Sequence, residues 1–451
     1  MAARIVAVAS AVAAALVWGA VQPPARAAGE GGAGPLRLTL AQAVAEALEA
    51  NPGLKVLSHR SVAAERSAEA VSRERWGQVD AFFSYSRTND AWVVRPMSEE
   101  ILGDAGGFGA LPWDRNQQHY GMSFQLPLYL GGRLSNKTEL SRLETEGAAA
   151  LLEGTRWQVR FNAVSLYTAA QALDAVVAGF DELVASLEKT RERLELMVRL
   201  GKRPKLDRLK VVEQLEDAKA QREAVRADRA RVGAMLLALL GRDPSRRVAV
   251  DPQEGRVPEL ERDPRELAAR LGRTSRVRQA RIAAEQRRRN VALATASFLP
   301  SVVAEGNYTR NDAPSVGDPL DTWQVIVSVK VPLFRGGSRF AALEAARERE
   351  RAAEYGIEQA RLTVAADLQD ALARFRSARA ELAAARARVA AAAEAARIEQ
   401  IRYEAGAGTI EDLLRAQARR ASARASLAKA LGAVVTAAER INSIVEEDVV
   451  R

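Results

Sequence analysis

The sequence contains no cysteine, which excludes disulfide bonds and thiol chemistry. It has only two histidines, and no paired carboxylates or nucleophile–base pattern is recognisable, so we expect no enzyme activity, no metal and no cofactor. Aromatic residues make up 5% of the chain, while alanine and arginine fill long stretches. This composition is typical of paired helices that contact one another through small residues.

Neither sign of charge is concentrated in one block. Lysine and arginine number 66 against 57 acidic residues, for a net charge of +9. Such an excess raises nucleic-acid binding as an alternative. The basic residues alternate with Glu and Ala, as in Arg386, Arg388, Glu394 and Arg397. Solvated helix faces explain this pattern, and we expect no nucleic-acid partner.

Long apolar runs are also absent after the first residues. Residues 1–28 are predicted to be a signal peptide, with Arg4, an apolar run of 14 residues at Ile5–Trp18 and an Ala-Arg-Ala cleavage sequence at 25–27. Beyond it no run approaches the roughly 20 apolar residues of a membrane-spanning helix. If the mature chain enters a membrane, we expect it to do so with β-strands.

Sequence motifs recur along the chain at a fixed spacing. The sequence PLYLGGR at 127–133 returns 205 residues later as PLFRGGS at 332–338. The same offset separates Gly201 from Gly406, Asp207 from Asp412, and Leu209 from Leu414. Upstream the offset is 223, between Tyr85 and Tyr308, so an 18-residue insertion, read as a loop, lies between positions 88 and 119. We interpret the chain as an internal duplication.

The duplication predicts the domain organisation. The first repeat covers 29–241, an equatorial linker 242–263, the second repeat 264–447, and a C-terminal tail 448–451. Each repeat has the order helix, β-hairpin, very long helix, tight turn, long helix. The β-hairpins are expected at about 79–128 and 301–332, and the long helical hairpins at about 133–241 and 338–447.

The predicted strands, 79–88, 119–128, 301–310 and 322–332, alternate between apolar and polar residues. In the last of them one face carries Trp323, Val325, Val327, Val329 and Val331. This pattern is typical of strands in a water-filled transmembrane barrel. Aromatic residues near the strand ends suit the two membrane interfaces: Trp76, Tyr129, Phe298, Trp323 and Phe334. The alternative is a soluble β-sandwich, for which four strands are too few.

The long helices carry a seven-residue apolar repeat, which predicts left-handed supercoiling. In the first repeat it runs Leu152, Val159, Leu166, Leu173, Phe180, Leu187 and Leu194. In the second it runs Leu368, Phe375, Leu382, Val389 and Ala396. A helix over 133–200 is about 100 Å long at roughly 1.5 Å per residue. The predicted fold class is mainly α, a long coiled-coil helical barrel with a small transmembrane β part.

Four strands cannot close a barrel, and an open sheet edge is unstable in lipid. Two chains would supply eight strands, which side chains usually fill, whereas three would supply twelve and enclose water. We therefore expect several copies of the chain to share one barrel.

Several motifs together resemble the TolC-type outer-membrane efflux proteins over nearly the whole mature length. They are Leu38-Thr39-Leu40 with Asn51-Pro52, the two Pro-Leu-x-x-Gly-Gly sequences, and the segment from Arg402 to Gln417. The resemblance implies a homotrimer with a twelve-stranded β-barrel, which forms a channel in the outer membrane and extends into the periplasm. It also implies two partners, a periplasmic adaptor (membrane fusion) protein and an inner-membrane pump of the RND, ABC or MFS type.

Function is expected to concentrate at the two helix–helix turns, the periplasmic tip. The predicted gate residues are Gly201, Asp207, Tyr403, Gly406, Gly408, Thr409, Asp412 and Arg415. Gly201 and Gly406 suit left-handed helix ends, and Thr409 suits a helix start. Asp207 and Asp412 either stabilise the following helix dipole or, as the resemblance implies for Asp207, bond to Tyr403 and hold the aperture shut.

This sequence departs from the family pattern at two tip positions. Gly408 stands where well-known members have an arginine, and Arg415 replaces a second acidic residue. The other turn is crowded with basic residues: Lys202, Arg203, Lys205, Arg208 and Lys210. These differences predict an altered gate with a positive constriction.

The expected function is an outer-membrane export duct for multidrug or metal efflux or for type I secretion. The alternative is a soluble periplasmic coiled-coil adaptor or scaffold, which would leave the aromatic-flanked strands in water. The sequence does not identify the cargo.

Overall fold

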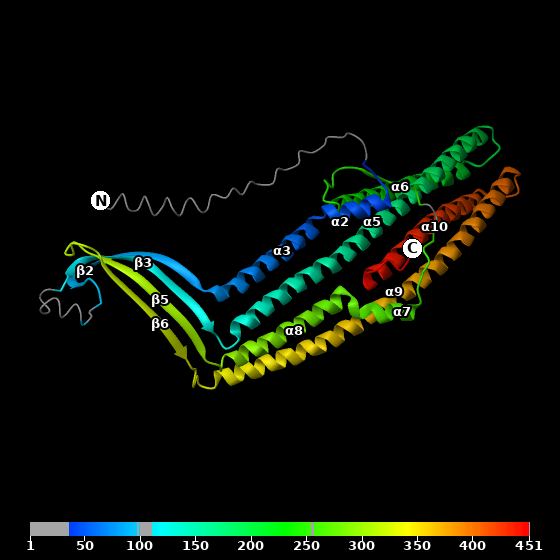
Figure 1. The fold of residues 1–451 in the computed structure, drawn as a ribbon. Helices are drawn as coiled ribbons and strands as arrows, with labels where there is room; N and C mark the ends of the chain where they lie inside the picture. Colours follow the sequence, from blue (N-terminus) through cyan, green and yellow to red (C-terminus); the bar gives the residue numbers. More distant parts are fainter. Residues whose placement is uncertain (1–35, 97–98, 100–110, 254–256, 451) are drawn as a thin grey trace.

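The computed structural model describes residues 36–96, 99, 111–253 and 257–450. The predicted signal peptide lies outside these residues, as does most of the predicted insertion. The molecule is elongated, with a small sheet at one end and the turns of two long helical hairpins at the other (Figure 1). Helices α3 and α8 run from the sheet toward the middle of the bundle.

The elements follow the same order in each half of the chain. The first half contains β1 Leu36–Leu38, α2 Leu40–Ala50, α3 Pro52–Arg73, the 3-10 turn η1 Glu74–Trp76, β2 Gln78–Val93, β3 Trp113–Tyr129, α5 Arg133–Arg199, α6 Lys205–Leu239 and β4 Val248–Val250. The second contains α7 Pro264–Arg270, η3 Leu271–Arg273, α8 Ser275–Ala296, β5 Ser301–Asp312, β6 Leu320–Lys330, α9 Ser338–Glu404 and α10 Ile410–Val445. Helices α5 and α9 each have 67 residues, and α3 and α8 each have 22.

Local sequence explains where the first helices begin. Thr39 and Gln42 form a reciprocal capping box at the start of α2. Asn51 then ends α2 and caps α3, because its Oδ1 accepts from the Leu54 N–H at 3.0 Å. The Asn51 side chain also donates to the Leu239 carbonyl at 2.7 Å, which fixes this helix break against the end of α6.

Four strands form one antiparallel sheet in the order β2-β3-β5-β6. The first two are longer than predicted: β2 reaches Val93 and β3 begins at Trp113. Trp92 and Val93 pair with Asp114 and Trp113 after a register shift beyond Arg87. Pro96 and Pro112, two of the residues that predicted a loop, therefore lie closer to the strand ends than expected.

The seven-residue repeats are confirmed as the contact seams of the bundle. Leu187 and Leu194 of α5 are fully buried with Leu215 of α6, and Leu368 of α9 is fully buried with Ile441 of α10. Helix α5 contacts α6 on one side and α10 on the other, and α10 contacts α9. The four helices thus lie in the lateral order α6, α5, α10, α9.

The middle of the molecule contains a small second sheet that the sequence analysis missed. Strand β1 pairs in parallel with β4, and the Tyr167 hydroxyl of α5 donates to the Leu38 carbonyl at 2.9 Å. The predicted linker and tail also meet, because Leu260 bridges to Val450. Val449 and Val450 are buried in the core of the second half, so these tail residues are part of its packing.

The sequence analysis predicted that no helix after the signal peptide is apolar enough to span a membrane, and α5 is an exception. Within the described part of the chain, α5 has a stretch that is long and apolar enough to do so by length and composition. Helix α5 contacts α2, α3, α6, α8 and α10, and 39% of this stretch is buried, so packing against other helices accounts for part of its apolar character.

Candidate functional site

The sheet has one continuous apolar face. Strand pairing places Trp323, Val325, Val327 and Val329 of β6 opposite Tyr308, Gly306, Ala304 and Val302 of β5. The same face continues across β3 through Met122, Phe124 and Leu126, and across β2 through Ala81 and Val79. Beyond Tyr308 and Trp323 it ends in an ion pair between Arg310 and Asp321, at 3.4 Å. The predicted alternation is confirmed.

The opposite face of the sheet is mostly polar. Gln125 donates to Glu305 at 2.7 Å, and the imidazole of His119 lies 2.8 Å from the Asn311 side-chain oxygen. Phe82 and Ile326 are apolar exceptions on this face. A sheet that is apolar on one side and polar on the other suits a wall between lipid and water.

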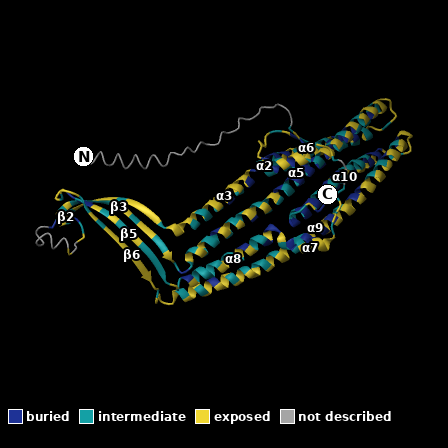
Figure 2. Cartoon of the chain, viewed as in Figure 1, coloured by how far each residue is buried: buried dark blue, intermediate teal, exposed yellow. Residues whose placement is uncertain are grey.

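The apolar face is not covered by the chain's own helices (Figure 2). Trp323 is 76% exposed and Val327 is 60% exposed. Aromatic side chains are exposed at both ends of the sheet: Trp76, Tyr129 and Phe334 near the helices, and Trp92, Trp113 and Trp323 at the far end. Phe298 differs, because its ring packs against Phe340 with centroids 5.1 Å apart.

The two outer strands leave their far edges unpaired. Within the described residues, β2 pairs only with β3, and β6 pairs only with β5. Both edges therefore present backbone N–H and C=O groups that need partners.

At the other end of the molecule, both helical hairpins turn at a glycine in the left-handed conformation. Gly201 has φ of +69° and Gly406 has φ of +77°. The following N–H groups reach back in the same way, Lys202 to the Met197 carbonyl at 2.8 Å and Ala407 to the Arg402 carbonyl at 2.9 Å. This double turn is the Schellman arrangement that satisfies the last carbonyls of a helix.

The return helices begin as the sequence predicts. Thr409 caps α10 by accepting from the Asp412 N–H at 3.1 Å, and its hydroxyl donates to the Asp412 carboxylate at 2.7 Å. Pro204 precedes α6, and Asp207 lies in the first turn of that helix. Both aspartates therefore have the dipole-stabilising position.

The bond between Asp207 and Tyr403 is not formed in this structure. Tyr403 is 8% exposed and packs with Leu187, Leu194 and Ile410, and no described residue bonds to its buried hydroxyl. Burial, together with the nearby Asp207 charge, raises the pKa of Tyr403, while Arg203 opposes this shift. Because the ring is held by the apolar cluster, Asp207 acts on the hydroxyl only through its field.

Residues outside the predicted gate set connect the two hairpins. Arg203 lies over the Tyr403 ring, 4.7 Å from its centroid, and donates to the Tyr403 carbonyl at 3.3 Å. Lys210 pairs with Glu411, and Arg193 pairs with Glu404 at 3.3 Å. The sequence analysis noted the basic residues of this turn but missed that the opposite hairpin offers acidic partners to them.

Gly408 and Arg415, the two residues that depart from the family pattern, both lie near the second turn. A Cβ atom on Gly408 would lie 3.0 Å from the Tyr403 backbone nitrogen, so a larger residue needs a shift of the turn. Arg415 is exposed on α10, and its guanidinium lies 3.9 Å from the Asp412 carboxylate. Arg415 therefore partly neutralises Asp412 instead of extending an acidic surface.

A buried charged cluster joins the halves near the middle of the bundle. Arg160 of α5 pairs with Glu439 of α10 at 2.7 Å and also with Asp448. Burial raises the pKa of Glu439, against the opposing effect of Arg160. Asn442 completes the cluster by accepting from the Val449 and Val450 N–H groups at 2.9 and 3.0 Å.

The described residues contain no group of three or more His, Cys, Asp or Glu side chains that could hold a metal ion. The arrangement offers a two-sided sheet, a long bundle and a charged tip.

Comparison with known proteins agrees with this architecture. Residues 269–445 match the family described as outer membrane efflux protein. The chain is 30% identical over 209 residues to protein CyaE of Bordetella pertussis, an alignment covering 45% of this chain and 44% of CyaE. It is 28% identical over 204 residues to outer membrane protein OprJ of Pseudomonas aeruginosa, covering 43% of this chain and 41% of OprJ. The aligned regions thus span less than half of each relative.

The fold similarity extends over most of the chain. The Campylobacter jejuni CmeC outer membrane channel superposes with a TM-score of 0.77 at 16% sequence identity, covering 91% of this chain and 86% of CmeC. Most of the chain therefore has the same overall fold as this solved channel. Residues 269–445 are thus similar to the outer membrane efflux protein family, and the fold of the chain is that of a solved outer membrane channel.

Proposed function

We propose that this chain is one subunit of a trimeric outer-membrane duct that conducts substrates from the periplasm to the cell exterior. Three copies would contribute twelve strands to one barrel, which is wide enough for water. Their helical hairpins would continue the barrel as a tube into the periplasm. The recurring order and lengths of the elements support an origin by internal duplication.

The observation that carries this proposal is the four-stranded sheet, with its uncovered apolar face and two open edges. A membrane provides the apolar medium that this face requires, and neighbouring copies provide the partners that the edges require. The relatives point the same way, because OprJ is named an outer membrane protein and CmeC an outer membrane channel. A soluble adaptor would leave the same face in water.

We assign the gate to the tip residues Gly201, Asp207, Tyr403, Gly406, Gly408, Thr409, Asp412 and Arg415, and we add Arg203 and Lys210. The added residues hold the first hairpin against the second through Tyr403 and Glu411. Separation of the hairpins would break these contacts. No described residues form a site that could supply energy for separating the hairpins. We therefore propose that a periplasmic adaptor and an inner-membrane pump drive opening.

Reconstitution of the purified protein in planar lipid bilayers tests this function. We expect stepwise ion conductance from the wild-type protein, with a larger conductance for the Arg203→Ala/Lys210→Ala double variant, since two hairpin contacts are lost. Lys202→Ala is the matched control, because it removes a charge from the same turn but no ion pair is formed by Lys202 within the described structure. Failure of the wild-type protein to insert or conduct would refute the duct.

The same recordings distinguish two sets of contacts that could hold the gate closed. If Arg203 and Lys210 hold the tip, Tyr403→Phe leaves the conductance unchanged, because the Tyr403 hydroxyl has no partner among the described residues. If a bond to Asp207 in a closed trimer holds the tip, Tyr403→Phe and Asp207→Ala both raise the conductance.

A further inference from the structure

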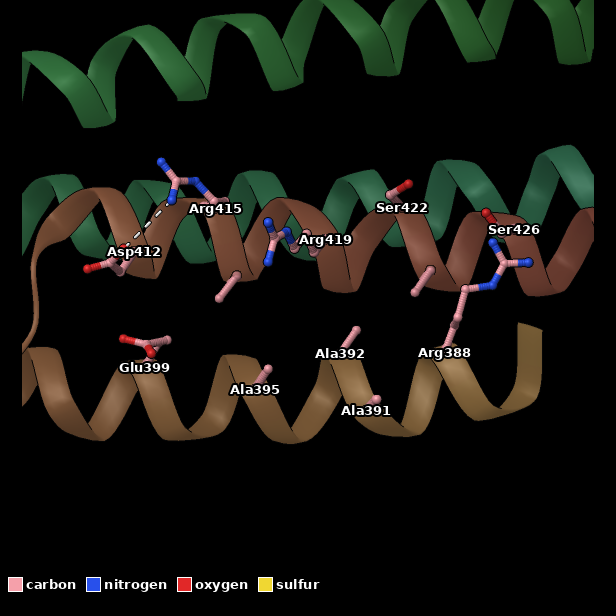
Figure 3. Close-up of a pocket in the computed structure, with 12 residues that line it drawn as sticks. Arg388, Ala391, Ala392, Ala395, Glu399, Asp412, Arg415, Arg419, Ser422 and Ser426 are labelled. Atoms are coloured by element: carbon pink, nitrogen blue, oxygen red, sulfur yellow. Dashed lines mark ion pairs between the residues drawn. The ribbon is translucent and has the colours of Figure 1, made fainter. Parts of the chain in front are cut away.

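A groove runs along one face of α10 near the tip. Its α10 side carries Arg415, Arg419, Ser422 and Ser426, whose spacing of four, three and four places them on one helix face. Its α9 side carries Ala391, Ala392 and Ala395. Because these alanines are small, they leave a hollow of about 550 Å³ between the helices. Figure 3 shows the Arg388 side chain reaching from α9 toward Ser426.

A second hollow continues this groove toward the middle of the molecule. It has a volume of about 940 Å³ and is lined from three helices, including Phe161 of α5, Glu381 of α9 and Lys429 of α10. An ion pair between Glu381 and Arg388 joins the two hollows, because Glu381 lines the second and Arg388 the first. Together they form one surface, which we call the α10 groove.

Basic side chains outnumber acidic ones in the α10 groove. The basic residues are Arg374, Arg388, Arg415, Arg419, Lys429 and Arg440, and the acidic residues are Asp370, Glu381, Glu399 and Asp412. Each acidic residue already has a basic partner: Arg374 for Asp370 at 2.7 Å, Arg388 for Glu381, Arg402 for Glu399 at 2.9 Å, and Arg415 for Asp412 at 3.9 Å.

Two of the basic residues remain available to a ligand. Arg419 and Lys429 form no ion pair within the part of the chain that the structure describes, and both are exposed. Arg440 stacks on the Phe161 ring, 5.4 Å from its centroid, and so keeps its charge without an acidic partner. The groove therefore carries positive charge that no acidic residue within the described ranges neutralises.

The adjacent row of residues on α10 differs, because an acidic side chain pairs with its arginines. Arg420 and Arg424 both pair with Glu182 of α5, at 3.6 Å in the case of Arg420. Arg419 and Arg420 are adjacent on α10, but only Arg420 has an acidic partner among the described residues.

Resting on the proposed duct, we propose that the α10 groove lines its interior and binds anionic cargo, namely organic anions that have an apolar body. The acid group of such a molecule pairs with Arg419 or Lys429, since guanidinium and ammonium groups bind carboxylates and sulfonates by charge-assisted hydrogen bonds. Its apolar body lies on the alanine floor. A positive lining also concentrates anions over cations in the pore.

Ion selectivity of the full-length protein in planar bilayers tests this inference. The reversal potential in a KCl gradient gives the ratio of chloride to potassium permeability, and 1-naphthalenesulfonate serves as the organic anion. We expect chloride to permeate better than potassium and 1-naphthalenesulfonate to reduce the current. Arg419→Gln, alone and with Arg415→Gln, should lower the permeability ratio severalfold and weaken the block.

Arg420→Gln is the matched control, because it removes the same charge from the neighbouring position, where Glu182 already pairs with the arginine. It should change both readouts much less than Arg419→Gln. A conducting protein that prefers potassium, or equal effects of the Arg419 and Arg420 variants, would overturn the anion site and leave the duct standing. Absence of any conductance would instead refute the duct and this inference with it.

Discussion

The sheet and the helical bundle of this chain differ in how far their apolar side chains are buried. In the bundle, Leu368 and Ile441 are fully buried, whereas in the sheet Trp323 is 76% exposed and Val327 is 60% exposed (Figure 2). Burial of a side chain the size of valine or leucine is favourable by about 1.5–3 kcal/mol. The bundle buries its apolar side chains and can therefore lie in water. The apolar face of the sheet would be unfavourable in water, which indicates that the two ends of the molecule lie in different surroundings.

The largest expected effect comes from placing a charge on the apolar face of the sheet. Val325→Arg, in the middle of β6, should cost about 2–4 kcal/mol per subunit in a bilayer and prevent assembly in the outer membrane. Gln324→Arg is the control, because Gln324 lies on the polar face of the same strand. The amount of assembled protein in outer-membrane fractions measures the difference. Equal assembly of the two variants would remove the contrast between sheet and bundle.

A second variant tests the bundle side of the comparison. Leu368→Ala removes a fully buried side chain from the seam between α9 and α10, and we expect a loss of about 2–5 kcal/mol in unfolding free energy. Leu362→Ala, on the same helix but 65% exposed, should cost much less. Thermal unfolding followed by circular dichroism in detergent measures both. A larger loss for Leu362→Ala would show that this exposed face is the better packed one.

The smallest effect concerns the buried charges at the middle of the bundle. Because burial raises the pKa of Glu439 above its ordinary value of 4.5, the folded state holds this proton more tightly than the unfolded state. Its contribution to stability is present below about pH 4.5 and is lost as the pH rises through the raised pKa. The unfolding temperature should therefore rise as the pH falls from neutral toward 4.5.

Glu439→Gln should flatten this pH dependence, since the titrating group is removed. Part of the dependence should remain, because burial also raises the pKa of Glu446, which accepts from the Ser275 N–H at 2.8 Å. Glu348→Gln, an exposed change on α9, provides the control. A pH profile that is the same in Glu439→Gln and the wild-type protein would show that Glu439 does not titrate in this range.

Local patterns in the sequence predict much of this structure. The heptads identify the buried seams, and the residues Gly201, Gly406 and Thr409 identify the helix ends, because each depends on backbone or side-chain properties within one or two turns. Strand alternation predicts the apolar face for the same reason. These features need no knowledge of distant contacts.

Features that depend on distant contacts were predicted less well. The extension of β2 to Val93 depends on its partner strand, and the pairing of β1 with β4 joins segments about 200 residues apart in sequence. The surroundings of Tyr403 depend on packing between hairpins. The bond to Asp207, one of the two roles predicted for that residue, is not formed in this structure, and the contact with Arg203 was missed. The charges and sequence spacing of Asp207 and Arg203 do not show which of them contacts Tyr403.

The central claim is that three copies close one ring through the free edges of β2 and β6. Because the chain has no native cysteine, Ser84→Cys on β2 and Ser328→Cys on β6 can be joined specifically by a flexible bis-maleimide linker in outer-membrane preparations. The account predicts covalent dimers and trimers, with no larger species, and predicts only monomers when either cysteine is absent. A ladder that ends at another number, or monomers alone from the double variant, would contradict it.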